Sequence, residues 1–137
     1  MKAVVDTNVV AYYLVGNTQF EAEAKRFWES VRDPLAPAIW EAEIANVVWM
    51  SIRAGVLPEA AGSAKLRSAR RLGIHTIETR ALWHSALRRS VQTGVAVYDT
   101  LFVELAERER APLATFAQRL LKTWQAIAPR LGEITGR

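Results

Sequence analysis

The apolar positions of this chain form short continuous runs that alternate with longer stretches of helical periodicity. Short runs at 2–5, 74–77, 95–98 and 113–115 predict strands, and 35–38 and 126–128 predict two further short extended segments. The run at 2–5 lacks polar alternation, which indicates a central strand buried on both faces.

Helical patterns fill the intervals between these runs. They cover residues 6–15, 18–31, 39–53, 58–72, 81–92, 99–109 and 118–122. Asp6 is placed to cap the first helix, Thr18 and Glu21 have the spacing of a capping box, and Pro58 suits the first position of a helix. Strands separated by helices pair in parallel, so we predict one α/β domain over 1–137: a three-layer α/β/α sandwich with a central, mostly parallel sheet.

Composition narrows the class of protein. The chain has no cysteine, which excludes disulfides and thiolate zinc sites and suits a reducing cytoplasm. Its longest apolar stretch, near 44–52, is too short to cross a bilayer, so we expect a soluble, cytoplasmic protein without membrane contact.

Positive charge is concentrated in one part of the chain. The formal net charge is +4, and residues 53–89 hold eight basic side chains against two acidic ones. This bias favours a polyanionic partner, and Arg53, Arg70 and Arg71 are the candidate phosphate contacts. The alternative interpretation is a solvated helical face without a binding role.

Three carboxylates are the candidate catalytic residues. Asp6 and Asp99 each follow a predicted strand, and the carboxyl ends of parallel strands share one edge of a sheet. Either residue alone would be explained as a helix cap. Glu43 lies in the most apolar helix, where an unpaired charge is costly, and Asn46 lies one turn further on the same face, where it could orient Glu43.

Three converging carboxylates repel one another unless a cation lies between them. Oxygen ligands of this kind favour Mg²⁺ or Mn²⁺, so Asp6, Glu43 and Asp99 are also the candidate metal ligands. A cation held in this way polarises a phosphodiester and activates water, which points to hydrolysis of a nucleic-acid backbone.

Four segments in this order resemble one family: VVDTN, PAIWEAEIANVVW, VAVYDTLFVELA and LATFAQRLL. They are similar to a PIN-domain ribonuclease, in particular to VapC-type toxins of toxin–antitoxin pairs. The resemblance implies a Mg²⁺- or Mn²⁺-dependent endoribonuclease, an RNA substrate, a homodimer and a VapB-like antitoxin. It also implies that Asp6, Glu43 and Asp99 are the family's first three acids, with Thr7, Asn8, Asn46 and Thr115 as supporting polar residues.

The chain departs from the family pattern at the fourth acid, where Ala117 replaces the usual aspartate after Thr115. Three explanations stay open: deliberate inactivation of a toxic nuclease, a natural site in which three acids suffice, or a member that binds without cutting. The last would be a non-catalytic RNA- or antitoxin-binding module. A phosphotransfer domain is a weaker alternative, because a phosphatase of that kind needs a second aspartate where the chain has Asn8.

Overall fold

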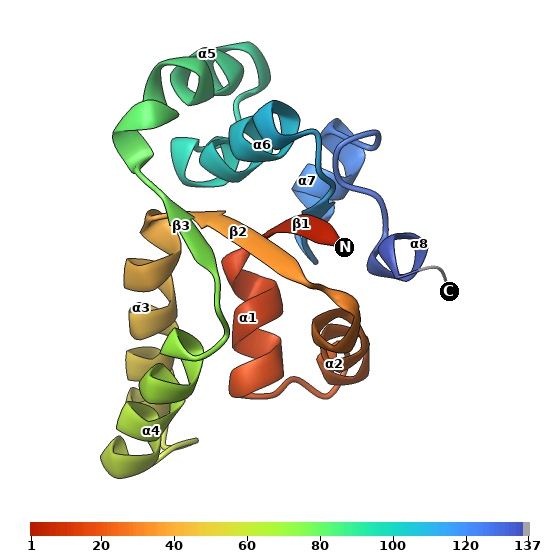
Figure 1. The fold of residues 1–137 in the computed structure, drawn as a ribbon. Helices are drawn as coiled ribbons and strands as arrows, with labels where there is room; N and C mark the ends of the chain where they lie inside the picture. Colours follow the sequence, from red (N-terminus) through yellow and green to blue (C-terminus); the bar gives the residue numbers. More distant parts are fainter. Residues whose placement is uncertain (136–137) are drawn as a thin grey trace.

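A parallel sheet forms the centre of the computed structural model, which describes residues 1–135 (Figure 1). Its strands are β1 (Lys2–Val5), β2 (Asp33–Pro37), β3 (His75–Ile77) and β4 (Leu113–Ala114). They run parallel in the order β3-β2-β1-β4, with β1 between β2 and β4. The predicted α/β sandwich with a central parallel sheet is confirmed.

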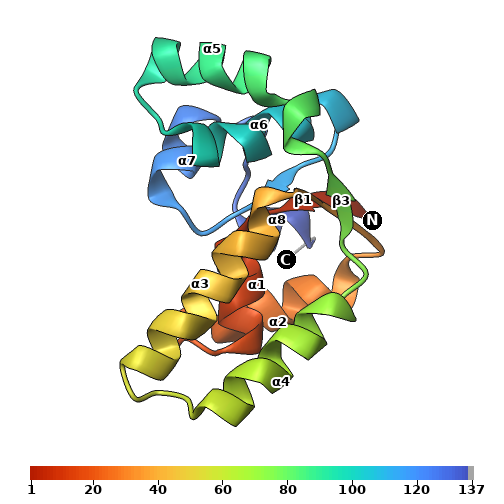
Figure 2. The ribbon, with the colours of Figure 1, turned by 90° about the vertical axis from the view of Figure 1, so that its left-hand side faces the viewer.

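Helices cover both faces of this sheet (Figures 1 and 2). One layer contains α1 (Thr7–Leu14), α2 (Glu21–Ser30), α3 (Ile39–Arg53) and α4 (Glu59–Arg70). The opposite layer contains α6 (Val97–Glu109) and α7 (Gln118–Thr123), with α5 (Trp83–Thr93) packed on α6 after a short 3₁₀ turn at Thr79–Ala81. The last helix, α8 (Leu131–Ile134), packs against α2. None of the helices within residues 1–135 is long and apolar enough to cross a membrane.

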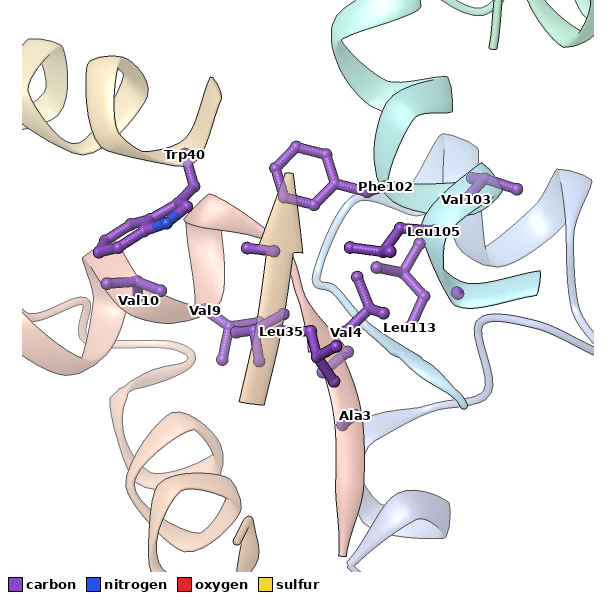
Figure 3. Packing of buried hydrophobic residues seen from close by; sticks show 14 of the residues in the cluster. Ala3, Val4, Val9, Val10, Leu35, Trp40, Phe102, Val103, Leu105 and Leu113 are labelled. Carbon is purple, nitrogen blue, oxygen red and sulfur yellow. The ribbon is translucent and has the colours of Figure 1, made fainter. Parts of the chain in front are cut away.

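The core fills the space on both sides of β1 and β2 (Figure 3). Val9, Val10 and Trp40 pack on one side of these strands, and Phe102 and Leu105 pack on the other. The three apolar residues of β1 after Lys2 have no exposed surface, which confirms the prediction of a strand buried on both faces. Burial of each of the two valines stabilises the fold by about 1.5–3 kcal/mol, and the smaller Ala3 contributes less.

Two of the predicted strands are wrong. Residues 95–98 do not extend, because Ala96 caps α6 and the helix begins at Val97, with Val95 buried and Tyr98 63% exposed. Residues 126–128 form a turn, although the Ile127 carbonyl accepts a hydrogen bond from the Leu113 N–H at 2.8 Å. Short apolar runs of this kind do not distinguish a strand from the start of a helix or a buried turn.

The predicted capping box at Thr18 and Glu21 is also wrong. The carboxamide oxygen of Asn17 accepts hydrogen bonds from the N–H groups of Gln19 and Phe20, at 2.9 and 3.0 Å. Asn and Thr both suit this role, and the chain places Asn17 one residue ahead of the expected position. Pro58 likewise precedes α4 as its cap residue instead of occupying the first turn.

An ion-pair network centred on one buried carboxylate joins α5 to α6. Glu104 is 7% exposed, and its carboxylate accepts hydrogen bonds from Arg89 at 3.0 Å and Arg108 at 2.6 Å. Arg108 also donates to the Ala81 carbonyl. Burial alone would raise the pKa of Glu104, but the bonds from Arg108 and Arg89 outweigh it and lower that pKa. Glu104 and Arg108 thus form the i, i+4 pair expected from their spacing.

Candidate active site

Asp6 is the first acid of the candidate site and lies where β1 ends. Its N–H donates to the Ala114 carbonyl on β4, which continues the ladder and fixes the backbone. The side chain is only 6% exposed. One carboxylate oxygen accepts a hydrogen bond from the Thr7 N–H at 2.8 Å, so Asp6 caps α1 as predicted. The same residue lies at the end of the central strand.

Two polar residues hold the other oxygen of Asp6. The Thr115 hydroxyl donates to it at 2.7 Å, and the Asn8 carboxamide N–H lies 3.3 Å away. The Asn8 carboxamide oxygen in turn accepts from the Phe116 N–H, and the Thr115 hydroxyl accepts from the Ala117 N–H at 3.0 Å. The loop after β4 is therefore tied to the loop after β1 at the point where the fourth acid would stand.

Glu43 reaches the same place from α3, more than thirty residues along the chain. The Thr7 hydroxyl donates to its carboxylate at 2.7 Å. The Glu43 carboxylate is half-buried in apolar surroundings, and this hydrogen bond offsets part of the cost of burying its charge. Asn46 was expected to orient Glu43, but its exposed carboxamide instead donates a hydrogen bond to the Met50 sulfur at 3.5 Å.

Asp99 also reaches the site, but by a different route from the one expected. It lies in the first turn of α6, after the Ala96 cap, and not at the end of a strand. Arg119, on the first turn of α7, is the cation whose charge acts on it. The start of a helix suits a carboxylate because the helix dipole is positive there.

These groups line one open pocket of about 530 Å³. Asp6, Glu43 and Asp99 contribute its carboxylates, and Thr7, Asn8, Asn46, Tyr12 and Tyr98 contribute further polar groups. Ala117 lines the same pocket, so an aspartate at this position would face the three acids. Thr115 is 1% exposed and supports Asp6 from outside the pocket.

The pocket raises the pKa of all three acids. For Asp6, burial is the main cause, the Thr115 hydrogen bond opposes it, and repulsion from Asp99 and Glu43 adds to it, raising the pKa from 3.8 to about 7. Burial also raises the pKa of Glu43 against its Thr7 hydrogen bond, with repulsion from Asp99 adding to the effect. Burial raises the pKa of Asp99, and Arg119 opposes it. Clefts with strongly perturbed acids are typical of functional sites.

The chemistry of this pocket fits a hard divalent cation. Burial and the mutual repulsion of the carboxylates both disfavour their charged forms. A cation bound among them would offset both effects. Within residues 1–135, however, no three acidic, histidine or cysteine side chains lie close enough together to form a ready-made metal cage. A cage of three such side chains is not needed for Mg²⁺, which usually keeps several waters and binds directly to only one or two carboxylates.

The three predicted phosphate contacts lie away from this pocket. Arg53 stacks over the Trp49 ring at 5.4 Å on α3, Arg70 lines a separate groove between α3 and α4, and Arg71 is exposed at the end of α4. The structure does not bring them to the carboxylates, so their binding of phosphate stays a prediction.

Sequence reasoning missed Tyr12, Tyr98 and Arg119. Tyr98 directly precedes Asp99, and Arg119 follows Ala117 by two residues, so proximity to the acid positions was the available signal. For Tyr12, the only signal in the sequence was its position one helical turn after Asn8. Their polar groups line or face a pocket whose other members come from segments distant in the chain.

The arrangement defines a parallel α/β protein with a carboxylate pocket at the end of the central strands. The family model described as the PIN domain matches residues 3–123, and the chain belongs to this family. A phosphotransfer domain gains no support from this membership.

Individual proteins show the same likeness. Ribonuclease VapC3 of Pyrobaculum aerophilum is 28% identical over 131 residues, which cover 93% of this chain and 98% of that protein. The crystal structure of the P. aerophilum protein PAE2754 matches with a TM-score of 0.74 at 20% identity, covering all of this chain and 88% of the other. A chain of a toxin–antitoxin complex from Klebsiella pneumoniae matches with a TM-score of 0.65 at 16% identity, over 90% of this chain and 92% of that one. The resemblance to VapC-type PIN domains is confirmed.

Proposed function

We propose that this chain is a VapC-type endoribonuclease that hydrolyses RNA phosphodiester bonds with Mg²⁺ or Mn²⁺. The observation that carries the proposal is the convergence of Asp6, Glu43 and Asp99 on one pocket in a PIN domain. The similar protein named ribonuclease VapC3 supports RNA as the substrate.

Each acid has a separate part in the proposed reaction. Asp6 and Asp99 would hold the cation, which when bound polarises the phosphodiester and lowers the pKa of the attacking water. Glu43 is fixed by Thr7, so it can accept a proton from that water or hold it in place. Thr115 and Asn8 keep the buried Asp6 carboxylate turned toward the pocket.

Ala117 favours a second candidate, a PIN-domain module that binds RNA or an antitoxin without cutting. The methyl group supplies neither a ligand nor an acceptor for water at a position that lines the pocket. Loss of such a supporting group typically lowers metal affinity or activity by about 10- to 100-fold. Under the ribonuclease proposal, the same loss would make this chain a weak nuclease with an intact fold.

We also propose a VapB-like antitoxin and a homodimer as the assembly partners. The toxin–antitoxin complex with the same fold supports the first. Exposed apolar side chains on α3 support the second, since Trp49 and Met50 are each 53% exposed. An RNA substrate and the lack of cysteine favour the cytoplasm.

Calorimetric titration of Mn²⁺ into the protein tests the site. We expect one saturable binding event that Asp6→Asn and Asp99→Asn each weaken at least tenfold. Glu41→Gln, an exposed acid on the same helix as Glu43 but outside the pocket, is the control and should bind as the unaltered chain does. Equal binding by all four proteins would place the cation elsewhere and refute the proposed site.

A further inference from the structure

A second and larger pocket adjoins the candidate active site. It has a volume of about 820 Å³, within the range of about 300–1,000 Å³ usual for ligand pockets. Its lining residues come from α2, α7, α8 and the loops beside them, including the loop after β4. Figure 1 shows where these helices lie. That loop separates the two pockets: Thr115 and Gln118 line the larger one, and Ala117 between them lines the carboxylate pocket. A strand whose phosphate reaches the acids therefore has this space directly beside it.

Stacked aromatic rings form the wall on that side. The rings of Phe20 and Phe116 stack with centroids 4.5 Å apart and planes 25° apart. Tyr12, which lines the carboxylate pocket, packs on both rings at 5.6 and 5.5 Å. Phe20 and Phe116 are only half-buried and line the larger pocket. An aromatic ring that keeps part of its surface accessible beside a nucleic-acid site can serve as a platform for a base, because every base presents a π-face.

The remaining lining is balanced in charge. Besides Thr115 and four apolar residues (Leu121, Ala128, Pro129 and Leu131), it contains two amides, two cations and two carboxylates: Gln118, Gln125, Lys122, Arg130, Glu23 and Glu133. A site for a second phosphate would carry an excess of cations. Amide and carboxylate groups instead match the donors and acceptors on the edges of a nucleobase.

We propose that this pocket holds one base of the RNA strand, next to the phosphodiester held at the carboxylates and stacked against Phe116. The inference rests on the proposed ribonuclease function and adds a base-binding subsite to it. The polar groups around Gln118 and Gln125 would then give the enzyme a preference at that nucleotide.

Photocrosslinking and equilibrium binding test the subsite. A short single-stranded RNA carrying 4-thiouridine is bound to the unaltered protein with Ca²⁺, which takes oxygen ligands as Mg²⁺ does, in place of Mg²⁺ or Mn²⁺. The complex is irradiated, and the crosslinked peptides are identified by mass spectrometry. We expect crosslinks to Phe116 or Phe20. In anisotropy titrations with the same RNA, Phe116→Leu should weaken binding about tenfold, as loss of one stacking platform does.

Matched controls separate the subsite from general effects. Gln125→Ala, an exposed rim change that leaves the aromatic wall intact, should weaken binding by a few fold, which keeps the test open if Phe116→Leu does not fold. Trp83→Leu and Gln92→Ala, exposed positions on α5, should leave binding unchanged.

The possible results distinguish this proposal from the ribonuclease proposal. If the protein cuts RNA but crosslinks lie elsewhere and both pocket variants bind normally, the subsite is refuted and the ribonuclease stands. If the pocket variants lose binding of an antitoxin peptide and not of RNA, the pocket belongs to a peptide, which also refutes the subsite. If RNA neither binds nor is cut, both proposals are refuted.

Discussion

Replacing Asp6 with asparagine should make the metal-free protein more stable at alkaline pH. The unfolded chain releases the Asp6 proton near pH 4, whereas the folded protein keeps it until about pH 7. The folded state thus binds more protons between these values, and its stability falls as pH rises through that window. A shift of about three pKa units corresponds to about 4 kcal/mol at pH 8. Asparagine, like the neutral carboxyl, avoids this cost, and the raised pKa already includes the Thr115 hydrogen bond, so we expect a net gain of up to about 4 kcal/mol.

Urea unfolding in EDTA at pH 5 and pH 8 measures this effect. The stability of Asp6→Asn relative to the unaltered chain should rise by about 2–3 kcal/mol between the two pH values, because other titrating groups cancel in that comparison. Asp33→Asn, an exposed carboxylate on β2, is the control and should show no such rise. Adding Mg²⁺ at pH 8 should stabilise the unaltered chain and not Asp6→Asn. If Asp6→Asn is no more stable than the unaltered chain at pH 8, the buried charge is not destabilising and the argument is refuted.

Two further predictions concern the packing that supports the site. Glu104→Gln should lower the free energy of unfolding at pH 7 by about 2 kcal/mol, because it weakens two charged hydrogen bonds, and the difference should close as pH falls through the lowered pKa of Glu104; equal urea midpoints at pH 7 would contradict this. Gly62→Ala should cost up to about 2 kcal/mol in thermal unfolding, because overpacking of about 1–3 kcal/mol, from a Cβ 2.6 Å from Ile52 and 3.0 Å from Val48 where α4 crosses α3, exceeds the gain in helix propensity of about 1 kcal/mol. Ser63→Ala, exposed beside it, is the matched control, and an unchanged Tm for Gly62→Ala would show that the helices separate without cost.

The sequence predicted those parts of the fold whose signals are local. The uninterrupted apolar run before Asp6 identified the buried central strand. Because Asp6 directly follows this strand, parallel pairing of the strands was enough to predict its position at the edge of the sheet. Glu43 was predicted from the cost of a charge in an apolar helix, and the structure places it in the pocket with Asp6.

Other features depend on packing that the sequence does not display. The apolar run at 95–98 is equally typical of a strand and of the start of a helix. Only the packing of α6 on the sheet decides between these two structures. Glu43 is held by Thr7 and not by Asn46, a choice set by how α1 lies against α3. The wall of Tyr12, Phe20 and Phe116 joins residues about a hundred positions apart, which no local periodicity reveals.

Cleavage of a mixed RNA pool in Mn²⁺ or Mg²⁺ measures whether the carboxylate pocket hydrolyses RNA. The proteins compared are the unaltered chain, Ala117→Asp, and Ala117→Asp combined with Asp6→Asn as the blank. We expect metal-dependent cleavage by Ala117→Asp, at least tenfold faster than by the unaltered chain and abolished in the blank. If neither the unaltered chain nor Ala117→Asp cuts RNA with either metal, the carboxylate pocket is not a ribonuclease site and the binding module replaces it.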